Sequence, residues 1–137
     1  MFVDTSVLAY VFDSTDNERR GKAKALVESV FLGKNKATVS NQVLGELANI
    51  LITKKHFKAE PKEALAFIQY LETSKNWRKV NYSTKTIQAA LEISLETGLH
   101  LWDSVIAATM KENGETEITT DNWKDFQKIP WLKVKRL

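Results

Sequence analysis

Apolar residues follow two patterns along this chain, namely short runs and longer stretches with helical spacing. Short runs that contain apolar and β-branched residues predict strands at 1–3, 37–40, 79–82, 118–120 and 132–134. Longer stretches, most of them with apolar residues three or four positions apart, predict helices at 7–12, 18–31, 41–53, 62–71, 84–97 and 101–111. Strands and helices that alternate in this way indicate an α/β fold with a mostly parallel sheet.

Residues that cap or end helices support these boundaries. Asn41 suits the N-cap of the third helix, and Pro61 suits the first turn of the fourth. Gly33 and Gly98 lie just past the ends of helices, where glycine is common. No repeat, linker or low-complexity tract interrupts the pattern, so we expect one domain over residues 1–137.

The composition agrees with a folded domain and excludes several kinds of site. Of the 137 residues, 43% are hydrophobic and 27% are charged, which is the balance of a globular protein. The absence of cysteine excludes disulfides, a thiolate nucleophile and a Cys-ligated metal. Only His56 and His100 are available as imidazole ligands. A metal would therefore be held mainly by carboxylate oxygen, which favours Mg²⁺, Mn²⁺ or Ca²⁺ over zinc.

The sequence indicates neither secretion nor a membrane location. The N-terminus lacks the basic and apolar regions of a secretion signal, and no window reaches the roughly 18 apolar residues of a membrane span. We therefore expect no membrane association and a cytoplasmic location. The formal net charge of +3 is too small to indicate a nucleic-acid partner by itself, although basic residues gather at 54–58 and 122–137.

Two acidic residues directly follow predicted strands. Asp4 follows the first strand and Asp121 follows the fourth. In open parallel sheets, ligands bind beyond the carboxyl ends of the strands, so two acids there are expected to converge if their strands are neighbours. Taken singly, each acid is equally well explained as a helix cap or a turn residue.

Two further acids lie on predicted helices. Asp103 is followed at helical spacing by apolar residues, namely Ile106, Ala107 and Met110. A charge in line with an apolar stripe is costly without a partner, unless the helix begins at Ser104 and Asp103 is its cap. Glu46 lies at the edge of the apolar face of the third helix, where a surface glutamate is also common.

A cluster of such acids points to a particular chemistry. Neighbouring carboxylates repel one another and need a compensating cation. Mg²⁺ binds few carboxylates, keeps several waters and binds phosphates, which suits metal-assisted hydrolysis of a phosphodiester. The basic segments are then suited to hold flanking phosphates of a nucleic acid.

Four segments carry a resemblance to a known family, in this order and spacing: FVDTS at 2–6, NQVLGE at 41–46, WDSVIAA at 102–108, and TTDNWKDF at 119–126 followed by IPWLKV at 129–134. With these segments the chain resembles the PIN domain, and within it the VapC-like toxins of prokaryotic toxin–antitoxin pairs. The resemblance covers essentially the whole chain. It implies a three-layer α/β/α sandwich with a central, mostly parallel sheet.

The resemblance also implies an activity and a set of site residues. The implied activity is that of an endoribonuclease that depends on Mg²⁺ or Mn²⁺. The implied metal ligands and catalytic acids are Asp4, Glu46 and Asp103. The family often adds a fourth acid, for which Asp121, Asn122 and Asp125 each match in some register. We favour Asp121, because it follows the strand most closely. The small hydroxyl residues that orient the carboxylates in the family correspond here to Thr5, Ser6 and Thr120.

The partners implied by the resemblance are an RNA substrate, a cognate antitoxin that inserts into the catalytic groove, and a second copy of the chain in a homodimer. Trp102, next to Asp103, is placed to line such a groove, although a tryptophan at helical spacing is more often part of a core.

Two other functions are compatible with parts of the sequence. A catalytically inactive PIN-like module that binds RNA or a protein is the main alternative, and the presence of all four acids speaks against it. A phosphotransfer domain is disfavoured, because the segment Asp4–Val7 lacks a second aspartate two residues after the first.

Overall fold

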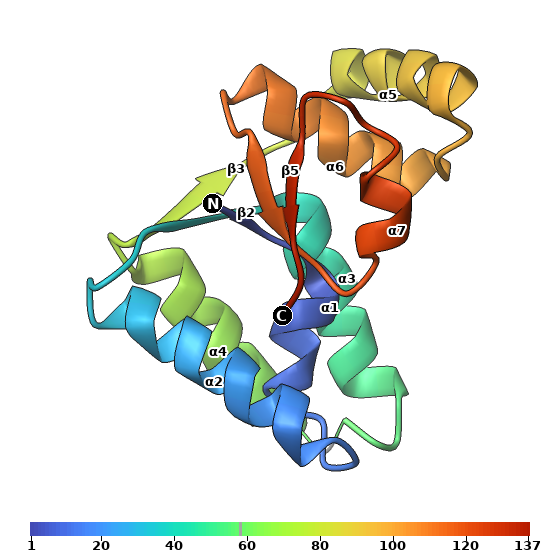
Figure 1. Ribbon diagram of the computed structural model, residues 1–137. Helices are drawn as coiled ribbons and strands as arrows, with labels where there is room; N and C mark the ends of the chain where they lie inside the picture. Colours follow the sequence, from blue (N-terminus) through green and yellow to red (C-terminus); the bar gives the residue numbers. More distant parts are fainter. Residues whose placement is uncertain (58) are drawn as a thin grey trace.

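A parallel five-stranded sheet runs through the middle of the molecule in the computed structural model, which describes residues 1–57 and 59–137 (Figure 1). Its strands are β1 (Phe2–Val3), β2 (Ala37–Ser40), β3 (Trp77–Val80), β4 (Glu117–Thr119) and β5 (Lys133–Lys135). Their order across the sheet is β3-β2-β1-β4-β5, so the first strand is central. The predicted α/β fold with a mostly parallel sheet is confirmed.

Helices flank the sheet. They are α1 (Thr5–Tyr10), α2 (Asn17–Phe31), α3 (Asn41–Thr53), α4 (Pro61–Thr73), α5 (Thr84–Thr97), α6 (Leu101–Glu112) and α7 (Trp123–Phe126). In Figure 1, α2 and α4 lie on one side of the sheet, and α5 and α6 lie together on the other. In the part of the chain that the structure describes, no helix combines the length and the apolar character needed to cross a bilayer.

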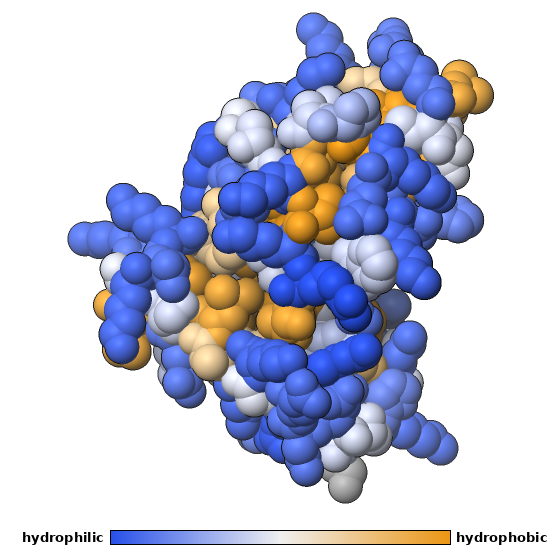
Figure 2. Space-filling model, in the orientation of Figure 1, coloured by the Kyte–Doolittle hydropathy of each residue, from blue (hydrophilic) through white to orange (hydrophobic). Residues whose placement is uncertain are grey.

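Burial on both faces accounts for the absence of charged residues from β1 and β2. Phe2 and Val3 of β1 are fully buried, and all four residues of β2 are buried. Parallel strands covered by helices on both faces have this character. The face of the molecule seen in Figure 2 is mainly hydrophilic, with apolar atoms gathered towards its middle.

Some boundaries differ from the sequence prediction. Strand β3 begins at Trp77, two residues before the predicted start, because Trp77 is buried and pairs with Ala37 of β2. The N-cap of α3 is Ser40, whose Oγ accepts from the Val43 N–H, and not Asn41 as predicted.

Three further differences concern the helices and the basic segments. Helix α1 begins at Thr5, directly after Asp4, and α4 begins at Pro61 itself. The short helix α7 was not predicted, since four residues carry no helical period. In the basic segment 54–58, Lys58 lies outside the described residues.

Gly98 ends α5 in the left-handed region, at φ 72°, and open space surrounds the position of an added Cβ. We expect Gly98→Ala to lower the free energy of unfolding by about 1 kcal/mol, because a Cβ is disfavoured in this conformation. The matched control is Gly21→Ala within α2, which also has open space and lacks a positive φ. It is expected to raise stability by about 0.5–1 kcal/mol. Urea unfolding followed by circular dichroism measures both, and changes of the same sign contradict this account.

Candidate functional site: carboxylates beyond the central strands

Asp4 lies at the carboxyl end of the central strand β1 and is only 7% exposed. Its Oδ1 accepts a hydrogen bond from the Thr5 backbone N–H at 2.7 Å. Its Oδ2 accepts from the hydroxyls of Ser6, at 2.9 Å, and Thr120, at 2.6 Å. Asp4 is therefore both the N-cap of α1 and a buried acid fixed by two different segments.

The charge of Asp4 has no basic partner. Burial raises the pKa of this carboxyl, and the hydrogen bonds from Thr120, Ser6 and Thr5 oppose that rise only in part. Glu46 adds a further rise in the same pKa by repulsion. Among the described residues, no lysine or arginine forms an ion pair with Asp4. The ionised form is thus left without internal compensation.

Glu46 projects from α3 towards Asp4 and is half-buried. Its Oε2 accepts from the Thr5 hydroxyl at 2.8 Å, and its Oε1 accepts from Gln42 Nε2 at 2.9 Å. Thr5 consequently links the two acids, because its backbone N–H binds Asp4 and its hydroxyl binds Glu46.

Asp103 lies in the first turn of α6, which begins at Leu101. The alternative, a helix that begins at Ser104 with Asp103 as its cap, is therefore wrong. The side chain is half-buried, and its Oδ2 accepts from Asn122 Nδ2 at 3.0 Å. Burial, followed by repulsion from Asp4 and other acids, raises the pKa of Asp103 to about 6.

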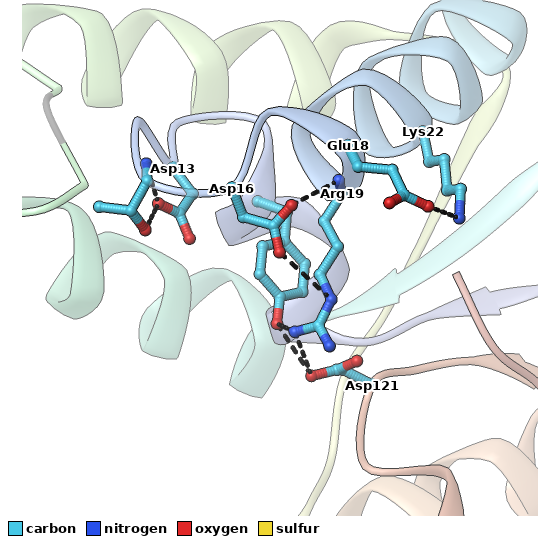
Figure 3. A network of polar contacts seen from close by, with 8 residues as sticks. Asp13, Asp16, Glu18, Arg19, Lys22 and Asp121 are labelled. Atoms are coloured by element: carbon cyan, nitrogen blue, oxygen red, sulfur yellow. Dashed lines mark hydrogen bonds and ion pairs between the residues drawn. The ribbon is translucent and has the colours of Figure 1, made fainter.

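Asp121 has different surroundings, although its backbone joins the same network. Its N–H donates to Ser6 Oγ at 3.2 Å. Its Oδ2 accepts from the Tyr10 hydroxyl at 2.8 Å and forms an ion pair with Arg19 at 3.3 Å (Figure 3). Arg19 also lies 3.5 Å from Asp16 and donates to the Tyr10 hydroxyl at 2.5 Å. Asp121 thus differs from Asp4, Glu46 and Asp103 in having a cationic partner among the described residues.

The residues proposed for the fourth site position have separate partners. The Asn122 amide contacts Asp103, and its backbone N–H donates to Thr120 Oγ1 at 2.9 Å. Asp125 forms an ion pair with Lys128 at 2.9 Å, and this contact holds the pKa of Asp125 below its ordinary value. Of the three, Asn122 is the one whose side chain hydrogen bonds to Asp103, while repulsion from Asp125 adds to the rise in the pKa of Asp103.

Sequence reasoning missed three polar residues of this region, Tyr10, Arg19 and Gln42. Arg19 and Asp121 are 102 positions apart, and no local pattern links them. Gln42 is 7% exposed, and its Nε2 donates to Glu46 Oε1. Its one available signal was the four-residue spacing to Glu46.

The donor chemistry of the site fits a hard divalent cation. Asp4, Glu46 and Asp103 supply only oxygen, and among the described residues none of them has an ion-pair partner. Burial, with repulsion between the acids, raises the pKa of both Asp4 and Asp103, and a bound cation would oppose that rise. Within residues 1–57 and 59–137, no three Asp, Glu, His or Cys side chains stand at the spacing of ligands to one ion. The negative charge of the site therefore suits a cation, but the described side chains are not arranged at ligand distances around a single ion.

Comparison with known proteins identifies a family and related folds. The family model described as the PIN domain matches residues 1–132. No curated protein matches the chain in sequence.

Solved structures with the same fold include three bacterial proteins. Mycobacterium tuberculosis VapC20, described as a sarcin–ricin loop cleaving toxin, is 25% identical with a TM-score of 0.65, over 85% of each chain. A toxin–antitoxin complex from Klebsiella pneumoniae is 20% identical with a TM-score of 0.66, over 96% of this chain and 93% of that one. VapBC2 from Rickettsia felis, bound to a promoter DNA fragment, is 17% identical with a TM-score of 0.67, over 99% and 97%.

We expect Asp103→Asn to stabilise the metal-free protein at neutral pH. The pKa of Asp103 lies at about 6, above its ordinary 3.8, so the folded state holds this proton more tightly than the unfolded chain. This tighter proton binding contributes its full stability below the pKa of the unfolded chain. The contribution is lost as pH rises through the pKa of the folded state. Removing the ionisable group is expected to add on the order of 1 kcal/mol, or about 2–5 °C, allowing for the half-exposed position.

Thermal unfolding in EDTA at neutral and at acidic pH measures this effect. The gain should vanish in acid, where Asp103 is neutral in both states. Asp125→Asn is the matched control, since the Lys128 contact lowers the pKa of Asp125 and its replacement should give no gain. An equal gain for both variants, or none for Asp103→Asn, rules out an uncompensated charge at Asp103.

Proposed function

The chain belongs to the PIN domain family, as its sequence resemblance predicted, and on this premise we propose that it is a metal-dependent endoribonuclease that hydrolyses RNA phosphodiester bonds. The observation that carries the proposal is the set of three acids at the N-cap of α1, on α3 and on α6 without a basic partner among the described residues: Asp4, Glu46 and Asp103. A similar fold occurs in VapC20, a protein described as cleaving the sarcin–ricin loop.

In this proposal Asp4, Glu46 and Asp103 hold Mg²⁺ or Mn²⁺, and Asp121 is the fourth acid of the site. A divalent ion bound there supplies activation of water and neutralisation of the charge that develops on the phosphate. The protein's own contribution is to hold the acids in position. Three donors hold the Asp4 carboxylate, and two hold Glu46, so little reorganisation is needed during the reaction.

Arg19 and Tyr10 have a separate role in this scheme. Both of them bind the Asp121 carboxylate through its Oδ2 and so hold it in position. The Arg19 guanidinium carries further N–H donors, which suit a phosphate oxygen of the substrate. Arg19 is exposed, which allows such contact.

We further propose that the protein is a VapC-like toxin with a cognate antitoxin protein and that it forms a homodimer. Structures of similar fold include the toxin–antitoxin complex of Klebsiella pneumoniae and VapBC2 of Rickettsia felis. The cytoplasm remains the expected compartment for such an RNase.

We expect the purified protein to cleave RNA with Mg²⁺ or Mn²⁺ and to lose this activity in EDTA. Asp4→Asn and Asp103→Asn should each lower the rate more than about 100-fold, because each removes a charged ligand. Gel analysis of end-labelled RNA measures the rate, and circular dichroism checks that the variants fold. Leu95→Ala on the exposed face of α5 is the control and should cleave like the parent.

Cleavage that survives in both aspartate variants would show that a contaminant is responsible. If no RNA is cut and isothermal titration detects no binding of either metal, the nuclease proposal fails and the inactive binding module takes its place.

The fourth site position can be tested by comparing two aspartates that are close in sequence. We expect Asp121→Asn to lower metal-dependent cleavage by about 10- to 100-fold, since it removes the fourth acid. Asp125→Asn should change cleavage little, because Asp125 is paired with Lys128. Steady-state rates over a range of Mn²⁺ concentrations separate weaker metal binding from slower chemistry. A larger loss for Asp125→Asn than for Asp121→Asn would move the fourth position to Asp125.

A further inference from the structure

A cavity of about 450 Å³ lies beside the acids. Its walls come from α3, from the segment after β3 and from α6, and they are formed by Asn41, Gln42, Gly45, Glu46, Tyr82 and Trp102. Glu46 belongs to both the cavity and the carboxylate site. Trp102 directly precedes Asp103 in α6. A molecule in this cavity is therefore next to the proposed reaction centre.

Two aromatic rings border the cavity. The Trp102 side chain is 54% exposed, which is unusual for an indole in a folded domain. The Tyr82 ring lies with its centroid 6.4 Å from that of Trp102, and the two planes meet at 70°. This edge-to-face contact supports the indole from one side. The exposed part of the Trp102 ring is free to pack against another flat ring.

Gln42 connects these rings to the acids. Its Nε2 donates to Glu46 Oε1 and to the Trp102 backbone carbonyl, both at 2.9 Å. Both partners are acceptors, so the amide nitrogen must face them. The Gln42 Oε1 is buried and has no donor among the described residues. An amino or imino group of a nucleobase carries the kind of N–H that such an acceptor lacks.

The charge of the cavity indicates which part of an RNA fits there. The Glu46 carboxylate forms part of the wall and repels a phosphate, whereas a neutral base carries no such penalty. Stacking on an indole requires a base that is not already stacked in a duplex. The cavity therefore suits one unstacked base of a single strand, while the phosphate lies outside the cavity, at the divalent ion that the acids would hold in the proposed function.

We propose that this cavity is a nucleobase subsite, in which one base of single-stranded RNA stacks on Trp102 while the adjoining phosphate lies at the carboxylates. The inference rests on the proposed nuclease function, since it names how that site holds its substrate. It makes Trp102 a substrate-contacting residue that determines where in an RNA the chain acts. Gln42 joins the subsite to Glu46.

The first test observes the indole directly and needs no cleavage. Trp102 is identified in a ¹⁵N-correlated NMR spectrum as the indole signal missing from Trp102→Phe. AMP, CMP, GMP and UMP are then added to the parent protein, with ribose 5-phosphate as the probe that has the phosphate but no base. We expect the Trp102 signal to shift with the nucleotides and to stay in place with ribose 5-phosphate.

The second test measures affinity for a fluorescein-labelled single-stranded RNA in the Asp4→Asn background, where cleavage is suppressed. Trp102→Ala should weaken binding by about fivefold to 100-fold, the range given by loss of one base–aromatic stack. Trp102→Phe keeps a ring and should retain most of the affinity. Leu95→Ala removes a side chain of α5 that is 79% exposed and should leave affinity unchanged.

The outcomes separate this inference from the nuclease proposal. An unmoved Trp102 signal and unchanged RNA affinity in Trp102→Ala overturn the subsite, even if the parent cleaves RNA. A shift of the Trp102 signal with unchanged RNA affinity in Trp102→Ala also overturns it. The same holds if light scattering shows a change of oligomeric state in Trp102→Ala without a change in RNA affinity. Selective shifts and the expected loss of affinity support the subsite, and they do so for an RNA-binding module if no cleavage is found.

Discussion

The buried carboxylate of Asp4 is the constraint on which the rest of this site depends. The residue ends the central strand, and its backbone N–H still donates to Thr119 of β4, so the sheet fixes its position. Its side chain then ties together the start of α1 and the segment after β4 through Ser6 and Thr120. A buried anion is costly to a fold unless it is satisfied. Here hydrogen bonds hold the Asp4 carboxylate in position, but no cationic side chain among the described residues pairs with its negative charge.

The acids of the site differ in the partners that the protein gives them. Asp121 has Arg19 and Tyr10, while Asp103 has the neutral amide of Asn122. Within the described residues, the chain thus supplies a cationic partner for Asp121 and none for Asp4, Glu46 or Asp103. Polar contacts nevertheless run without a break from Gln42 through Glu46 and Thr5 to Asp4, and on through Ser6 to Asp121.

The sequence predicted the framework better than the contacts within it. Strand and helix order follow from apolar spacing, and β1 and β2 are recognisable because both are buried and neither contains a charged residue. The apolar stripe in line with Asp103 is buried as predicted, at Ile106, Ala107 and Met110. The position of β3 was misjudged because Trp77, which fixes its start, can equally belong to a helix or a loop.

Contacts between distant segments were beyond prediction from one sequence. The pair formed by Arg19 and Asp121 and the contact of Asn122 with Asp103 depend on how α2, α6 and the segment after β4 pack. Nothing in the residues that flank them encodes that packing.

Thr5 has a consequence for the kind of ion such a site accepts. One residue uses its backbone to hold Asp4 and its hydroxyl to hold Glu46, so the two carboxylates are spaced by the internal dimensions of a single β-branched side chain. The β-branched side chain of threonine has few rotamers, which restricts this spacing. In the metal site that we propose, the separation of Asp4 and Glu46 would thus depend on a residue that supplies no ligand. A substitution at Thr5 would then alter that separation while both acidic residues stay the same.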